Sequence, residues 1–159
     1  MRVVSQLKQE IKQQRSFRSL EEEVVLGMML TVDRLTAPIT ERLRQQDLGI
    51  SQYNVLRILR GAGNEGLPSG EIAERMIRRD PDLTRLLDRL ESRGVVTRAR
   101  DATDRRVVRA KITEAGLRLL DSLDDSIDHT VQRILAHVPK QRLRTLSKLL
   151  EEARAGQSG

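Results

Sequence analysis

Apolar residues recur at helical spacing in the first third of the chain. Val4, Leu7 and Ile11 lie on one stripe and predict a short amphipathic helix over residues 3–18. Ser19 followed by Glu22 has the form of a capping box, which predicts that a long second helix begins there. That helix carries two largely apolar stripes, one made of Val24, Met28, Thr31 and Leu35 and the other of Val25, Met29 and Val32. Two such faces indicate burial on both sides, against its own domain and against a partner.

Turn-forming residues mark where this long helix bends and ends. Pro38 lies inside the helical pattern and predicts a kink near Ala37. Gly49 is expected to end the helix, and Ser51 is expected to cap the next one. The glycine-rich residues 61–66 then predict a loop.

Two more helices are predicted in the middle of the chain. Ser69 is expected to cap a short helix over residues 70–76. Asp80 followed by Pro81 combines an acidic N-cap with a proline in the first turn, and predicts a helix that stops at Gly94. Its inward stripe consists of Leu83, Leu86, Leu87 and Leu90, and its exposed side consists of Arg85, Asp88, Arg89 and Arg93.

The spacing then changes from helical to strand-like. Residues 95–98 and 107–112 are rich in β-branched side chains, and residues 100–106 between them are rich in Asp and Arg, so a β-hairpin with a charged tip is predicted. Thr113 is expected to cap a long helix with Leu117, Leu120, Leu123, Ile127, Val131 and Ile134 inward. Pro139 opens a last helix that carries Leu143, Leu146, Leu149 and Leu150.

This order of elements predicts a mainly α (α+β) fold built on a winged helix-turn-helix. The winged helix-turn-helix domain is expected over residues 51–112, with a helical dimerisation region formed by residues 1–50 and 113–159. A dimer is favoured because the terminal apolar stripes have no third layer in the chain to cover them. The residues expected at the dimer interface are Leu7, Ile11, Val25, Met29, Leu143, Leu146 and Leu150.

Positive charge is concentrated in the same middle segment. The chain has a net charge of +6, and residues 51–112 alone contain 14 basic and 9 acidic side chains. A local excess of this kind indicates a polyanionic partner. A helix with a basic face fits the major groove of duplex DNA, and an arginine-tipped hairpin can reach phosphate or the minor groove. Double-stranded DNA is therefore the expected partner.

Composition argues against several other classes of protein. The absence of cysteine excludes disulfides and thiolate metal sites, and only Phe17 and Tyr53 could stack on bases. There is no apolar run that could span a membrane and no secretory signal, so a cytoplasmic location is expected. His129 shares a helix face with Asp121 and Asp125, but a solvated face is favoured there over a metal site. No nucleophile and base are placed together, so neither an enzyme nor a cofactor is expected.

Several motifs follow one another through the predicted helices and hairpin. They are Glu71-Ile-Ala-Glu-Arg-Met76, Leu83-Thr-Arg-Leu-Leu-Asp-Arg-Leu-Glu91, Arg93-Gly-Val-Val96, Asp101-Ala-Thr-Asp-Arg-Arg106 and Ile112-Thr-Glu-Ala-Gly116. In this order they resemble the multiple-antibiotic-resistance regulator (MarR) family, and the resemblance extends over about residues 25–150. The run from Leu83 to Glu91 joined to the Asp-Arg-Arg of the wing is the specific part of the resemblance.

The resemblance implies a transcription regulator, more often a repressor, that binds a palindromic operator as a homodimer. It places Thr84 and Arg85 on the recognition helix and Arg106 at a wing tip that enters the minor groove, with Asp104 orienting the wing arginines. Many members release DNA when a small phenolic or anionic effector binds. The residues expected to contact DNA are Arg78, Arg79, Thr84, Arg85, Arg89, Arg105 and Arg106.

The chain departs from the common pattern just before the recognition helix. Many members have Gly-Val-Ser-Pro-Ser-Thr there, whereas this chain has Ile-Arg-Arg-Asp-Pro-Asp at residues 77–82. Two alternatives to an operator-binding regulator stay open from the residues alone. One is a winged helix used for protein–protein contact, and the other is a protein that binds DNA without sequence preference.

Overall fold

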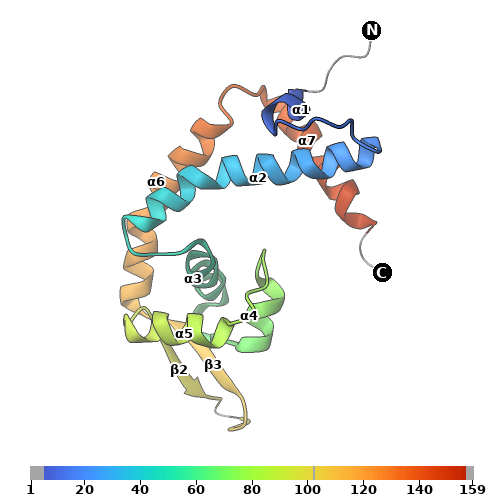
Figure 1. The fold of residues 1–159 in the computed structure, drawn as a ribbon. Coiled ribbons are helices and arrows are strands. Elements are labelled where there is room, and N and C mark those ends of the chain that lie inside the picture. Colours follow the sequence, from blue (N-terminus) through green and yellow to red (C-terminus); the bar gives the residue numbers. More distant parts are fainter. Residues whose placement is uncertain (1–5, 102, 157–159) are drawn as a thin grey trace.

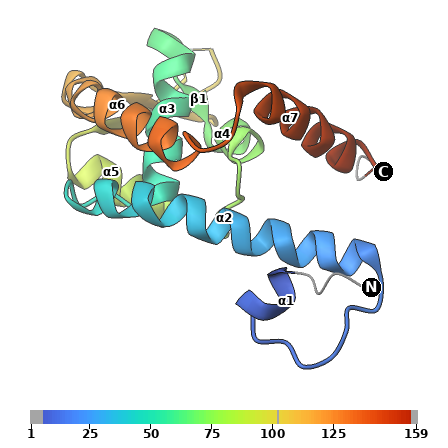
Figure 2. The same ribbon diagram turned by 90° about the horizontal axis from the view of Figure 1, so that it is seen from above.

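The computed structural model describes residues 6–101 and 103–156. Two long helices, α2 (Leu20–Arg44) and α6 (Glu114–Ile134), pack against each other and connect two ends of the molecule. The winged part lies at one end, and the small helix α1 (Gln6–Glu10) and the last helix α7 (Lys140–Ala155) lie at the other (Figures 1 and 2). The winged part itself consists of α3 (Ile50–Ala62), α4 (Ser69–Arg75), α5 (Leu83–Ser92) and a small sheet.

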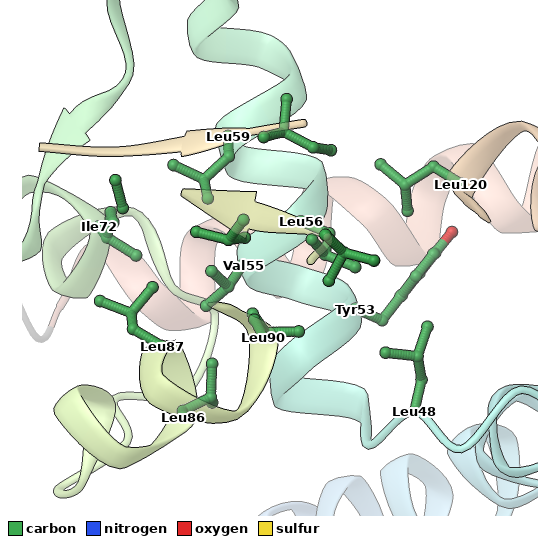
Figure 3. Packing of buried hydrophobic residues seen from close by; sticks show 14 of the residues in the cluster. Leu48, Tyr53, Val55, Leu56, Leu59, Ile72, Leu86, Leu87, Leu90 and Leu120 are labelled. Carbon is green, nitrogen blue, oxygen red and sulfur yellow. The ribbon is translucent and has the colours of Figure 1, made fainter. Parts of the chain in front are cut away.

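Helix α3 is the centre of the hydrophobic core. Its residues Val55, Leu56 and Leu59 are fully buried, and leucines of α5 and Leu120 of α6 lie around them (Figure 3). The end of α2 contributes Leu43 to the same cluster. The predicted inward stripe of α5 is confirmed, because all four of its leucines are buried. This packing leaves the opposite face of α5 in solvent.

The sheet has three strands, although the sequence analysis predicted only a hairpin. The expected hairpin is β2 (Val96–Arg100) and β3 (Val108–Ile112), antiparallel with Val96 opposite Ile112. A two-residue strand β1 (Leu67–Pro68) pairs with the other edge of β3, so the order is β1-β3-β2. Such a short strand has no alternating pattern of its own, and only its contact with β3 defines it.

The N-terminal helices differ in length from the prediction. Among the described residues helix α1 spans Gln6–Glu10 and stops well short of residue 18, with a positive φ of 51° at Lys12 in the turn that follows. Residues 3–5 of the predicted helix lie outside the described part of the chain. Ser19 caps α2 as predicted, since its hydroxyl accepts the Glu22 backbone N–H at 3.1 Å. Helix α2 continues through Pro38 and ends at Arg44, before Gly49. Packing of its last turns against the core holds the helix together where the proline removes a hydrogen bond.

Three predicted helix starts were displaced by one or two residues. Helix α3 is capped by Gly49 rather than Ser51, because the Gln52 side chain accepts the Gly49 N–H at 2.8 Å. Ser69 is the first residue of α4, not its cap. Helix α5 begins after Asp82 rather than Asp80, because the Asp80 carboxylate accepts the Asp82 N–H at 2.9 Å and holds the chain in a turn.

The C-terminal helices bury less than their patterns predicted. Thr113 caps α6 as expected, and Leu120, Leu123 and Ile127 are buried. Val131, which was predicted to face inward, is exposed, because at this turn the buried side of the helix passes through its neighbour Thr130. Helix α7 buries none of its residues within this chain, so its leucine stripe has no intrachain core to join.

Gly116 allows the start of α6 to lie directly against the strand that follows α5. A Cβ atom at this position would be 2.3 Å from the Val95 carbonyl oxygen, well inside any real contact. Thr113 reinforces the junction, with its hydroxyl donating to the Gly94 carbonyl at 2.6 Å. The backbones of α6 and the sheet are therefore fixed to each other at their closest approach.

Gly116→Ala is expected to destabilise the protein by about 1–3 kcal/mol, because the added methyl group must push backbone apart. Gly61→Ala in α3 is the matched control, since nothing lies within 4 Å of a Cβ there. Helix propensity alone should make that control more stable by roughly 0.5–1 kcal/mol. Urea unfolding of the two variants checks the prediction, and equal stabilisation of both would contradict the close contact at Gly116.

Candidate nucleic-acid interface

The exposed face of α5 carries the residues predicted to contact DNA from the recognition helix. Thr84, Arg85 and Arg89 all lie on the face opposite the buried leucines. The Arg85 side chain is 76% exposed, and its Nε lies 3.3 Å from a carboxylate oxygen of Asp82. Arg89 has no ion-pair partner among the residues that the structure describes. These side chains are free to approach base edges in a groove.

Arg105 and Arg106 lie in the exposed turn between β2 and β3, as predicted for a wing tip. The Arg106 side chain is 92% exposed. Asp104 accepts from the backbone N–H of Arg106 at 3.0 Å and from its Nε at 3.2 Å. This geometry is what an orienting role for Asp104 requires, because one carboxylate holds both the backbone and the side chain of Arg106.

The wing turn is organised by Asp101, which the sequence analysis did not single out. Its Oδ1 accepts the backbone N–H groups of Thr103 at 2.8 Å and Asp104 at 3.0 Å, and its Oδ2 accepts from Arg109. These hydrogen bonds lower the pKa of Asp101 from 3.8 to about 2, with the backbone N–H of Asp104 contributing most. An Asp at the end of a strand, followed by Thr and Asp two and three residues later, is the sequence signal that could have identified it.

Arg98 of β2 connects the wing to the recognition helix. Its Nη2 lies 2.6 Å from both Asp88 and Glu91 of α5, and its backbone N–H donates to Glu91 at 3.0 Å. The hydrogen bonds from Arg98 hold the pKa of Glu91 below its usual value. Sequence reasoning treated Arg98 only as part of a strand, because nothing local shows that its partners lie on the preceding helix. The wing and α5 are thereby joined directly to each other.

Arg78 and Arg79 lie in the exposed segment between α4 and α5. The acidic residues near them are Glu71 and Glu74 of α4, and Glu71 accepts from Arg75 of its own helix at 3.1 Å. Within the described part of the chain, neither Arg78 nor Arg79 has an ion-pair partner. Both guanidinium groups are available to an anion.

Two sets of contacts join this surface to the long helices. Arg60 of α3 makes a bidentate pair with Asp124 of α6, with N–O distances of 2.7 and 3.2 Å. Arg93, the C-cap of α5, is exposed as predicted, and its guanidinium group also donates to the carbonyls of Gln46 and Asp47 at 3.0 and 2.7 Å. These contacts set the orientation of the winged part relative to α2 and α6.

The residues predicted for a dimer interface lie on the other end of the molecule. On α2, Val25 and Met29 are exposed, Met29 by 63% of its surface, and Leu20, Val24 and Val32 lie exposed beside them. On α7, Leu146 is exposed, while Leu143 and Leu150 are half-buried. Leu7 and Ile11 are half-buried within the chain. An apolar surface of this kind is left uncovered by the single chain.

An open hollow of about 570 Å³ lies between the second half of α2 and the end of α6. Arg42, His129 and Arg133 are among the residues that line it. The residues described by the structure contain no group of three or more His, Cys, Asp or Glu that could hold a metal ion. The basic side chains instead make the hollow suitable for an anionic group.

Comparison with known proteins identifies the family. A family model described as "MarR family" matches residues 48–108. A crystal structure of a MarR transcription factor from Planctomyces limnophilus is 40% identical, covers 86% of this chain and 98% of its own, and superposes with a TM-score of 0.66. The chain belongs to the MarR family of transcription regulators.

Other relatives agree with this assignment and with the predicted fold. This MarR-family chain is 26% identical over 135 residues to the HTH-type transcriptional regulator FarR of Neisseria gonorrhoeae. The matched region covers 85% of this chain and 91% of FarR. A structure of the S. aureus MepR–DNA complex, at 22% identity and a TM-score of 0.73, covers 84% of this chain and 96% of its own, and it shows the shared fold. The mainly helical winged fold predicted from sequence is confirmed. No helix among the described residues is long and apolar enough to cross a membrane.

The low pKa of Asp101 makes the stability of the wing dependent on pH. Because folding favours the ionised carboxylate, its contribution is complete above about pH 4 and is lost as the pH falls toward 2. Asp101→Asn should therefore be less stable than the wild type at neutral pH, and the difference should shrink in acid. Urea unfolding across this pH range measures the difference, and NMR titration of the carboxyl group gives its pKa directly. A difference that stays constant down to pH 2 would contradict the assignment.

Proposed function

We propose that this MarR-family chain is a homodimeric repressor that binds a pseudo-palindromic operator in double-stranded DNA. The observation that carries the proposal is the rigid connection of two exposed basic elements, α5 and the wing, through Arg98. If α5 and the wing moved independently, fixing them on DNA would cost conformational entropy and lower the affinity. A fixed pair avoids that cost because both elements are already in place. A shared fold with a protein solved on DNA supports duplex DNA as the partner.

The proposal assigns roles according to what each side chain can reach. Thr84, Arg85 and Arg89 contact base edges in the major groove, where an arginine can bind guanine through two hydrogen bonds. Arg105 and Arg106 contact the minor groove or its phosphates. The segment before α5 contributes Arg78 and Arg79 as phosphate contacts, which position the protein without reading sequence.

Homodimerisation supplies the second half of the operator contact. The exposed apolar residues of α2 and α7 would be covered by the same residues of a second copy, as a two-fold interface requires. Residues 1–50 and 113–159 then form the dimerisation region, and residues 51–112 form the DNA-binding domain. Two α5 helices related by the two-fold axis would lie roughly 34–36 Å apart, one turn of B-DNA.

A selection of genomic DNA fragments with the purified protein tests the proposal, at about 150 mM salt because affinity depends on salt. The wild type should recover one palindromic motif, and Arg85→Ala/Arg106→Ala should lose it. Lys148→Ala/Arg154→Ala removes the same charge from α7, at the other end of the molecule, and should keep the motif.

Recovery of the motif by the Arg85→Ala/Arg106→Ala variant would contradict the assigned surface. Enrichment without any motif would indicate DNA binding without sequence preference. A binding constant independent of salt would favour a protein–protein module, because each phosphate contact should contribute a slope of about −0.9 in log K against log salt concentration.

Placing negative charge in the centre of the proposed dimer interface on α2 should disrupt the dimer. Val25→Asp/Met29→Asp should convert the dimer to a monomer, because two carboxylates from each copy would be buried without partners. Because the monomer holds only one half of the operator, its affinity for the operator should also fall. Sedimentation velocity measures the state of the protein. Ile77→Asp, at a side chain 90% exposed in the winged part, is the control and should remain dimeric. A dimeric double variant would place the interface elsewhere.

The proposal includes release of DNA by a small acidic effector bound in the hollow beside Arg42 and Arg133. A ligand present at 100 times its Kd would stabilise the folded protein by about 2.7 kcal/mol. In thermal melts, at least one of a panel of aromatic carboxylates should raise the melting temperature of the wild type, and Arg133→Ala should abolish this rise. The same carboxylate should weaken operator binding by the wild type. No shift with any acid of the panel would favour a DNA-binding protein that is not regulated by such ligands.

A further inference from the structure

The turn before α5 holds an acidic side chain against the arginine that faces DNA in the proposed complex. Asp80 accepts the Asp82 backbone N–H at 2.9 Å, and Pro81 between them restricts φ, so the position of Asp82 is well defined. Asp82 occupies the N-cap position of α5, but its carboxylate caps no helix N–H. Its Oδ2 lies instead 3.3 Å from Nε of Arg85, one turn further on.

Stability gives little reason for this pair. The Asp82 side chain is 52% exposed and that of Arg85 is 76% exposed, and such surface pairs contribute little to folding. A carboxylate in this position also repels the phosphates that the surrounding arginines attract. An acidic residue that weakens general attraction to DNA is expected to act on specificity instead.

The geometry of the pair leaves the part of Arg85 that recognises guanine unoccupied. A guanidinium group has one N–H donor on Nε and four on its two terminal nitrogens. The ion pair places the carboxylate beside Nε, so both terminal nitrogens remain free for the O6 and N7 acceptors of a guanine. If Arg85 turned to a phosphate, it would leave Asp82 unpaired beside the DNA backbone. The same contact therefore favours the base-reading arrangement and penalises the nonspecific one.

We propose that Asp82 is a specificity-determining positioning residue, which holds Arg85 so that each half-site of the operator must contain a guanine opposite it. The inference rests on the proposed function. It applies to this chain through residues 77–82, where its sequence departs from the Ser-Pro-Ser-Thr pattern of many family members.

Base preference is the readout that a purely structural role would not change. Binding is measured at about 150 mM salt with the operator motif selected by the wild type and with duplexes carrying each other base at every position. Arg85→Ala first identifies the position that Arg85 reads. Asp82→Ala should then lower the preference for guanine at that same position by about tenfold, while binding to unrelated DNA stays equal or becomes tighter.

Two further variants separate orientation from charge. Asp82→Asn removes the charge but keeps the size of the side chain and an oxygen beside Nε, so it should retain more of the preference than Asp82→Ala while binding all DNA more tightly. Asp82→Ala/Arg85→Ala should show no loss of preference beyond that of Arg85→Ala alone. The matched control is Glu41→Ala, which removes the acidic partner of another exposed pair with three-residue spacing, Glu41 and Arg44 of α2. It should leave base preference unchanged.

Each outcome distinguishes the inference from the function on which it rests. If the wild type selects no motif, the proposed operator binding is wrong and the inference falls with it. If the wild type selects a motif and Asp82→Ala changes affinity equally for every base, operator binding stands and Asp82 acts only through its charge. A preference lost at a position that Arg85→Ala does not affect would likewise overturn the inference.

Discussion

The wing and α5 are joined directly by one arginine. Arg98 contacts Asp88 and Glu91 through its guanidinium group, and its backbone N–H donates to Glu91 as well. The chain between α5 and β2 is only a short turn at Gly94, where φ is 70°. The Arg98 contacts tie the hairpin directly to α5, and the buried residues Val96, Ala110 and Ile112 anchor the same strands in the core.

Several acidic side chains of this surface make ion pairs with arginines. Asp82 pairs with Arg85, Asp88 with Arg98, Asp101 with Arg109 and Asp104 with Arg106. These four acidic residues therefore do more than reduce the net charge of the segment. A carboxylate restricts the rotamers of a long flexible side chain, so less entropy is lost when that side chain later binds a ligand.

Burial is divided unevenly along the molecule. The core surrounds α3 and takes in the last turns of α2 and α6 as far as Ile127, whereas α7 buries nothing and the first half of α2 exposes Val25 and Met29. The apolar pattern of the terminal helices is as regular as that of the core helices. A single chain does not bury these apolar residues, whereas the proposed second copy would cover them.

The sequence by itself determined the type and order of the helices, the hairpin and the exposed basic face of α5. Apolar period, caps such as Ser19 and Thr113, and glycine stops are local signals, and each acts over a few residues. Only the tertiary structure decided where α5 begins, that β1 exists, and that Arg93 and Arg98 bind groups on other elements. Those features depend on residues that are distant in sequence or on competition between neighbouring caps. Side-chain periodicity carries no information about either, because it records which face is buried and not what lies against it.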